Sequence, residues 1–142
     1  MIYTSLTKKA LKLCFEAHKD QVDKSGMPYV FHPFHLAEQM TDESTTVVAL
    51  LHDVVEDTDI TFEDLEKQGF SYEIINALKF LTHDRKTSYM EYVGEIKKNK
   101  IATKVKLADL RHNSDLSRLS VVDEKALKRK EKYEKAIKFL EE

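Results

Sequence analysis

The sequence predicts a single all-α domain, a bundle of helices, and three observations support this prediction. Apolar residues recur at three- and four-residue spacing along most of the chain, and no strand-like alternation persists. Only 3 Gly and 2 Pro occur among 142 residues, so turn signals are few and long helices are expected. A hydrophobic content of 42% suffices for one buried core, and no linker or repeat divides the chain.

Helix-capping and helix-breaking residues predict the boundaries of the helices in the first half of the chain. The first begins near Leu6 and stops before the loop KSGMPY. Pro33 suits the first turn of a short second helix that extends to Met40. The stretch TDEST offers N-cap residues for a third helix, which we expect to run through Asp57.

The second half continues the helical pattern. TFEDLEKQG predicts a short helix that Gly69 ends, and Ser71 can cap the next helix, YEIINALKFL. SYMEYVGEI and NKIATKVKLADLRHNSDL predict two more helices. The last helix, at about residues 121–141, is long and highly charged with a narrow apolar stripe, so we expect a docked helix with a solvated face. A coiled-coil arm or a partner-binding element is the alternative.

Composition excludes several classes of protein. Because 23 Lys and Arg balance 25 Asp and Glu, a surface for nucleic acid is not indicated. No apolar run approaches the ~18 residues of a membrane span, and the N-terminus lacks the apolar core of a signal peptide. The single cysteine, Cys14, has apolar neighbours and is expected to be a buried thiol. We therefore expect a cytoplasmic protein that binds neither nucleic acid nor membrane, and the oligomeric state stays open.

A polar cluster interrupts the apolar run ALLHDVVEDT, residues 49–58. On a helix over residues 47–57, four polar side chains share one face: His52, Asp53, Glu56 and Asp57. No Lys or Arg occurs between Ser44 and Lys67 to neutralise them, so the carboxylates repel one another. A divalent cation would remove this repulsion, because it accepts both imidazole nitrogen and carboxylate oxygen. An ordinary amphipathic helix with a solvated polar face is the alternative.

Further ligands for such a cation must come from elsewhere in the chain. His32, in PYVFHPF, follows a Gly/Pro loop from which a side chain can point into a cleft. Asp109 is a lone carboxylate among core residues of KVKLADLRHN, where a salt bridge to Lys106 or Arg111 is the alternative interpretation. A second His-Asp pair, His83–Asp84, has no carboxylates one turn later and is expected to belong to a loop or a cap.

Three segments, HKDQVDKSGMPYVFHP, ALLHDVVEDTDIT and VKLADLRHNSDL, resemble in this order the HD-domain hydrolases of the RelA/SpoT type. The resemblance is greatest to the stand-alone small alarmone hydrolases. It covers about residues 18–119 of what would be a single HD domain over 1–142, and implies an all-α bundle of the HD-domain type. It also implies a metal site, usually filled by Mn²⁺ although another divalent metal is possible, with the ligands His32, His52, Asp53 and Asp109.

The resemblance also implies catalytic and substrate-binding residues. Glu56 and Asp57 match the acidic pair that positions and activates the attacking water. Asn113 matches an asparagine that contacts the sugar of the nucleotide, and Lys24 matches a basic residue of the nucleotide pocket. The implied reaction is metal-dependent hydrolysis of a nucleotide phosphoester or pyrophosphoryl group, as in guanosine 3′,5′-bis(di/tri)phosphate 3′-pyrophosphohydrolases. The length leads us to expect neither a synthetase half nor appended regulatory domains.

Two departures from the family pattern concern the substrate pocket. Where the family usually has Arg-Lys before Ser-Gly, this chain has Asp23 before Lys24, and a carboxylate cannot stack on a base as a guanidinium does. The usual ADRLHN is ADLRHN here, which moves the arginine about 100° round the helix to Arg111, a candidate substrate contact. These changes favour an alternative in which the substrate is another nucleotide, such as a nucleoside monophosphate or a dinucleotide phosphate. A non-catalytic, metal-bound nucleotide sensor is a further alternative.

Overall fold

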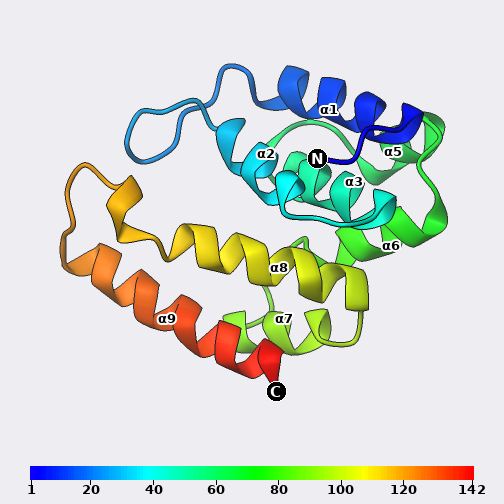
Figure 1. Cartoon of the computed structure of the whole chain (residues 1–142). Helices are drawn as coiled ribbons and strands as arrows, with labels where there is room; N and C mark the ends of the chain where they lie inside the picture. The colour runs from blue at the N-terminus through cyan, green and yellow to red at the C-terminus, as the bar shows by residue number, and fades with distance from the viewer.

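Nine α-helices and one 3₁₀ turn make up the computed structural model, which describes all of residues 1–142 (Figure 1). The elements are α1 (Ser5–His18), α2 (Phe31–Glu38), α3 (Glu43–Leu51), α4 (Val54–Asp57), α5 (Phe62–Lys67), α6 (Tyr72–Phe80), α7 (Tyr89–Ile96), α8 (Lys100–Asn113), η1 (Leu116–Arg118) and α9 (Glu124–Glu141). The only β-type pairing is an isolated bridge between Val22 and Pro28. The predicted all-α fold is therefore confirmed.

The central element is α3, which packs against α1, α2, α6 and α8. Every residue from Thr45 to Leu51 is buried, so the helix has no solvent face. Its N-terminus is fixed by Asp42, whose side chain accepts a hydrogen bond from the backbone N–H of Thr45. Such a cap satisfies one of the N–H groups that the first helical turn leaves without a partner. The helix thus holds its C-terminal end, where His52 follows, firmly inside the core.

The prediction that this helix runs through Asp57 is wrong. It ends at Leu51, His52 and Asp53 form a turn, and the four-residue α4 begins at Val54. The reason lies in the side chain of His52, whose Nδ1 lies 2.7 Å from the carbonyl oxygen of Ala49 and so satisfies a group at the helix end. Because α3 is covered on all sides, the four polar residues do not share one outward face of a single helix. His52 is buried at the break and Asp53 is half-buried, whereas Glu56 and Asp57 on α4 are exposed.

The remaining helices begin and end largely where the turn residues predicted. Ser71 caps α6, and α5 ends before Gly69, which has a φ of 93°. Pro33 lies in the first turn of α2. The loop KSGMPY joins α1 to α2 at the same side of the molecule as the segment that joins α8 to α9 (Figure 1), and the two segments are in contact through Ser25 and Arg118.

The charged C-terminal helix α9 is docked along α8 and α7 (Figure 1). Ala126, Ala136 and Leu140 are buried there, and most of its charged residues face solvent. This confirms the docked helix rather than a projecting arm. One core of 27 buried hydrophobic residues connects α1 with α9 and includes Cys14, whose pKa burial raises to about 12. No helix is both long and apolar enough to traverse a bilayer.

Candidate metal centre

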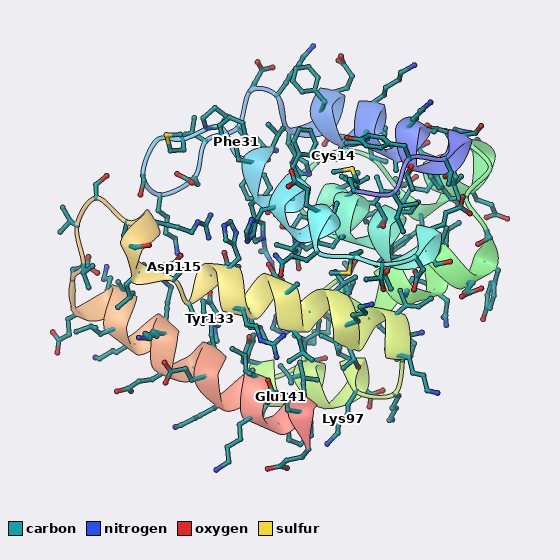
Figure 2. The ribbon with its side chains drawn as sticks, viewed as in Figure 1. Cys14, Phe31, Lys97, Asp115, Tyr133 and Glu141 are labelled. Atoms are coloured by element: carbon teal, nitrogen blue, oxygen red, sulfur yellow. The ribbon has the colours of Figure 1, made fainter.

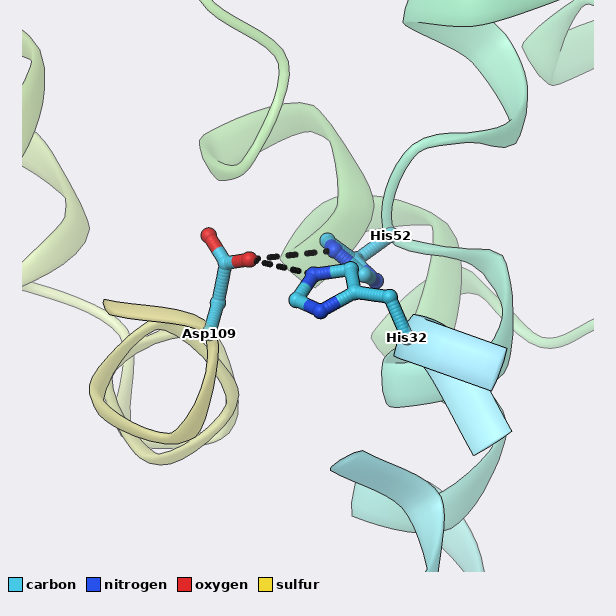
Figure 3. Close-up of side chains that lie close together, drawn as sticks. All are labelled: His32, His52 and Asp109. Carbon is cyan, nitrogen blue, oxygen red and sulfur yellow. Dashed lines mark hydrogen bonds and ion pairs between the residues drawn. The ribbon is translucent and has the colours of Figure 1, made fainter. Parts of the chain in front are cut away.

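Three buried side chains from distant parts of the sequence converge beside the break in α3 (Figure 3). His32 comes from the first turn of α2, His52 from the end of α3, and Asp109 from the middle of α8. Nε2 of His32 lies 2.8 Å from Oδ1 of Asp109, and Nε2 of His52 lies 3.5 Å from the same oxygen. Their ligand-type atoms all lie within 4.8 Å of one another. The three side chains can therefore reach one common centre.

The tautomer of His52 shows what the centre requires. Nδ1 faces the carbonyl oxygen of Ala49, which can only accept, so Nδ1 carries a proton and donates it. Nε2 is buried without a hydrogen-bond partner and faces Oδ2 of Asp53 at 3.0 Å as well as Asp109. A nitrogen lone pair against carboxylate oxygens is repulsive unless a positive charge lies between them.

The pKa of His52 also indicates that this site favours a positive charge. Burial lowers this pKa, but the carboxylates of Asp53 and Asp109 outweigh burial and raise it well above its usual value. The electrostatics of the site therefore favour a positive charge at Nε2, supplied by either a proton or a cation. Two imidazole nitrogens and carboxylate oxygens are the donor set that Mn²⁺, Zn²⁺ and Fe²⁺ accept, so the residues fit a metal.

Asp53 lies beside the three convergent residues and completes the predicted set of four. Its Oδ2 accepts a hydrogen bond from the hydroxyl group of Tyr29. Burial raises the pKa of Asp53, but His52 and Tyr29 outweigh burial and lower it to about 2. Asp53 is therefore ionised at neutral pH, and Tyr29 fixes its position. No pattern in the sequence indicates that Tyr29 holds a metal ligand in place.

Asp109 also makes the ion pair that the sequence offered as the alternative to metal binding. Its Oδ2 lies 2.9 Å from Nζ of Lys106, whereas its Oδ1 faces the imidazoles. Burial raises the pKa of Asp109, but Lys106 outweighs burial and holds that pKa well below its usual range. The two interpretations are compatible, because each oxygen of the carboxylate has its own partner.

His112 contacts the predicted ligand His32 from the side opposite Asp109. The two Nδ1 atoms lie 2.7 Å apart, and the rings lie edge to edge in nearly one plane, with centroids 5.0 Å apart and an interplanar angle of 7°. Burial and Arg118 lower the pKa of His112 to about 4, so its ring is neutral and can accept a hydrogen bond. A metal-bound histidine usually donates its other ring N–H to such a partner, which fixes the ring. His112 is thus suited to orient His32.

The acidic pair predicted to handle water lies on α4, directly after the break. Glu56 accepts a hydrogen bond at Oε1 from the backbone N–H of His83, at 3.1 Å. Burial raises the pKa of Asp57 to about 6, with further contributions from Asp53 and Glu56. The pair His83–Asp84 lies in a loop, where Asp84 accepts from the N–H of Lys86, so the loop expectation is confirmed.

A cavity of about 320 Å³ adjoins the cluster at His32 and Tyr29. Its other polar lining residues are Asp23, Lys24, Ser25, Asn113, Asp115, Arg118, Arg129 and Tyr133. Figure 2 shows Asp115 and Tyr133 on the two chain segments that border it, the turn after α8 and helix α9. Lys24 and Asn113, which the sequence predicts to contact the substrate, both line this cavity. The structure does not bring Arg111 there, because its guanidinium pairs with Glu141 at 2.5 Å on the outer surface.

Besides Lys24, the cavity is lined by two cations that the sequence did not identify, Arg118 and Arg129. Burial and the nearby charges of Arg129 and Lys132 lower the pKa of Lys24, and none of the three side chains forms an ion pair. Lys132 lies over the ring of Tyr89, with Nζ 4.1 Å from the ring centroid. The carboxylate of Asp123 offsets part of this positive charge, and the excess that is left attracts anions. The charged pattern of α9 gave no indication of which of its cations would face inward.

Comparisons with known proteins agree with this geometry. The sequence pattern of the family described as "HD domain" matches residues 10–113. A protein of Aquifex aeolicus (strain VF5) named guanosine-3′,5′-bis(diphosphate) 3′-pyrophosphohydrolase is 35% identical over 92 residues, which are 62% of this chain and 13% of that protein. A protein of the same name from Borreliella burgdorferi is 35% identical over 120 residues, which are 74% of this chain and 18% of that protein. The chain thus spans less than a fifth of the length of these relatives.

A solved structure of similar size also matches. It is described as "A metazoan ortholog of SpoT hydrolyzes ppGpp and plays a role in starvation responses". The TM-score is 0.80 at 26% sequence identity, and the match covers 99% of this chain and 87% of the other. The whole helical arrangement, including α9, therefore has a counterpart in a known structure.

Proposed function

This chain belongs to the HD domain family, and from that premise we propose that it is a metal-dependent phosphohydrolase of nucleotides. The proposed substrate is guanosine 3′,5′-bis(diphosphate) or its triphosphate form, from which the enzyme would release pyrophosphate at the 3′ position. The names of the relatives from Aquifex aeolicus and Borreliella burgdorferi support this choice. The observation that carries it is the convergence of three buried side chains, His32, His52 and Asp109, whose ligand-type atoms all lie within 4.8 Å of one another.

The residues that would hold the metal are His32, His52, Asp109 and Asp53. A bound divalent cation, proposed to be Mn²⁺, supplies a Lewis acid that lowers the pKa of water and neutralises phosphate charge. Two contacts within the protein would favour binding of this cation. The carbonyl of Ala49 keeps Nε2 of His52 available, and the hydroxyl of Tyr29 steadies Asp53.

The acidic pair would handle the proton of the attacking water. Asp57 suits a general base because its pKa of about 6 leaves it ionised at neutral pH yet basic enough to accept a proton. Glu56 is fixed by the N–H of His83 and would orient the same water. In the proposed hydrolysis the water oxygen bonds to the phosphorus atom nearest the sugar, the bond from phosphorus to the 3′ oxygen breaks, and that oxygen takes up a proton.

The cavity would receive the rest of the nucleotide. Asn113 borders both the metal centre and the cavity, which suits a contact with the sugar. Lys24 and Arg129 line the cavity and would provide positive charge for a phosphate group distant from the cleaved bond. A substrate with phosphates at both ends of its sugar would use both sites.

One observation favours a second candidate, an HD-domain phosphohydrolase acting on another nucleotide. Asp23 is occupied by hydrogen bonds from the N–H groups of Ser25 and Met27, and no arginine stands at this position to stack on guanine. Without that stacking, preference for guanine would have to come from other contacts.

The test has two steps. Metal content is measured on the purified protein, and the protein with Mn²⁺ is then incubated with a nucleotide panel that includes (p)ppGpp, nucleoside monophosphates and dinucleotide phosphates. The proposal expects rapid release of pyrophosphate from (p)ppGpp. Release of orthophosphate from another nucleotide, with (p)ppGpp untouched, would establish the second candidate instead. A metal-bound protein that cleaves nothing would point to a nucleotide sensor.

A further inference from the structure

Arg118, at the end of η1, is held by three acceptors at the wall of the cavity. Its Nη1 lies 2.9 Å from the carbonyl oxygen of His112 and 3.3 Å from Oδ1 of Asn113. Its Nη2 lies 3.9 Å from Oδ2 of Asp23. The guanidinium is therefore engaged between the end of α8 and the loop that joins α1 to α2.

The same residue also holds this loop through its backbone. Oδ1 of Asp23 accepts hydrogen bonds from the N–H groups of Ser25 and Met27, which shapes a tight turn around Lys24. Oγ of Ser25 then donates to the carbonyl oxygen of Arg118, 2.8 Å away and 93 residues later in the sequence. Side chain and backbone of Arg118 thus fasten the two ends of this turn, and Lys24 lies between them.

Arg118 also decides how the amide of Asn113 is oriented. A guanidinium can only donate, so the atom that faces it must be the amide oxygen. The Nδ2 group is thereby directed to Asp109, where it donates to Oδ1 at 3.0 Å, and its second N–H has no partner in the protein. A chain of polar contacts consequently runs from Asp23 through Arg118 and Asn113 to Asp109.

We infer that Arg118 is a positioning residue for substrate binding. It locks the loop that carries Lys24 against the end of α8, and it holds Asn113 with a free N–H available to a ligand. Asp23 serves as the cap of that loop and the counter-charge of Arg118, which gives a structural reason for a carboxylate at this position. The consequence for catalysis rests on the proposed function, whereas the locking of the loop does not.

Limited proteolysis tests whether Arg118 holds this loop in place, and it needs neither substrate nor metal. Trypsin cuts after Lys24 only when the loop opens, and the bond after Lys86 in the loop between α6 and α7 provides an internal reference. In Arg118→Ala and Arg118→Lys we expect cleavage after Lys24 to accelerate roughly tenfold, with cleavage after Lys86 unchanged. The matched control is Lys98→Ala, which removes an exposed ion pair with Glu95 and should change neither rate.

Two results of this experiment would overturn the inference. An equal acceleration after Lys24 and Lys86 would mean that Arg118 supports the whole fold rather than this loop. Unchanged cleavage after Lys24 in Arg118→Ala, or wild-type cleavage in Arg118→Lys, would mean that the forked guanidinium does not lock the loop, because a lysine cannot reproduce its geometry.

Kinetics with (p)ppGpp and Mn²⁺ test the consequence for binding. Both variants should raise KM roughly tenfold and change kcat by less than about twofold, because the loss falls on binding and not on the reacting groups. A fall in kcat at unchanged KM would contradict a positioning role in binding. If the wild-type protein does not hydrolyse (p)ppGpp, the proposed function fails, and the proteolysis result alone decides whether Arg118 locks the loop.

Discussion

Nε2 of His32 lies 2.8 Å from Oδ1 of Asp109, although 77 residues separate the two in the sequence. The contact joins α2 to α8, and His52 approaches the same oxygen from the end of α3. A histidine and a carboxylate in contact can be a simple ion pair. Here a second imidazole and a second carboxylate share the site, which is the arrangement of a metal centre.

Replacement of Asp109 tests its proposed role in metal binding separately from its ion pair with Lys106. Asp109→Asn keeps the shape but removes the charge that faces His32 and His52, so we expect less than about a tenth of wild-type metal content. The same change leaves Lys106 buried without its partner, which should cost about 3 kcal/mol of unfolding free energy. Metal content is measured by elemental analysis and stability by urea unfolding.

The matched control for that variant is Lys106→Met, which removes the ion pair and keeps every predicted ligand. It should retain about one metal per chain. Loss of metal in Lys106→Met with retention in Asp109→Asn would reverse the assignment of these two residues.

The acidic pair should affect turnover without affecting metal binding. Glu56→Gln keeps the acceptor for the N–H of His83, and Asp57→Asn removes the proposed base. We expect turnover of the preferred nucleotide to fall by about 10²- to 10⁴-fold in Asp57→Asn, because proton transfer to a positioned base contributes that much. Metal content and melting temperature should stay at wild-type values. Retained turnover in the double variant would remove both residues from the reaction.

His112 should influence metal affinity through His32 alone. His112→Phe keeps an aromatic ring but removes the nitrogen 2.7 Å from Nδ1 of His32, so affinity should fall about 10- to 100-fold. The control is His35→Phe, because His35 stacks on His112, at 4.1 Å between centroids, and does not touch a ligand. Competition with a chelating indicator measures both. Equal affinities in the two variants would show that His112 does not orient His32.

Asp42, the N-cap residue of α3, makes a pH-dependent contribution to the free energy of unfolding. Hydrogen bonds from the N–H and the hydroxyl of Thr45 lower the pKa of Asp42 in the folded protein. Its contribution is therefore fully present above its unfolded pKa of about 3.9 and is lost as the pH falls through the lower folded value. Asp42→Ala should cost about 1 kcal/mol at pH 7 and less at pH 3, measured by urea unfolding in EDTA.

Asp42→Asn serves as the control, because an amide accepts the same hydrogen bond but does not titrate. The difference in unfolding free energy between the Asn and Ala variants should be independent of pH. A difference between wild type and Asp42→Ala that stays constant from pH 7 to pH 3 would contradict the pKa shift.

The sequence predicted the fold well because its helices carry local signals. Ser71 and Gly69 mark their helix boundaries through their own backbone and side-chain chemistry, and the structure agrees. The break after Leu51 was missed, since it depends on the ring of His52 reaching back to the carbonyl of Ala49. The spacing of residues in the sequence does not indicate whether a side chain hydrogen-bonds to a carbonyl group of its own helix.

The convergence of His32, His52 and Asp109 could be predicted because their residue types are unusual among apolar neighbours. The pocket could be predicted only in part. Arg118 and Arg129 look like ordinary surface charges in the sequence, and only the packing of α9 and the η1 turn brings them to the cavity. Arg111 illustrates the converse, because its position on α8 directs it to Glu141 and away from the cavity.

The central claim is that one divalent cation is bound jointly by His32, His52, Asp53 and Asp109. Crystals grown with Mn²⁺ and measured at the manganese absorption edge test it most directly. The account predicts a single strong anomalous peak about 2.0–2.3 Å from Nε2 of His32, Nε2 of His52 and a carboxylate oxygen of Asp109. The absence of a peak there at saturating Mn²⁺, or a peak bound by other residues, would contradict it.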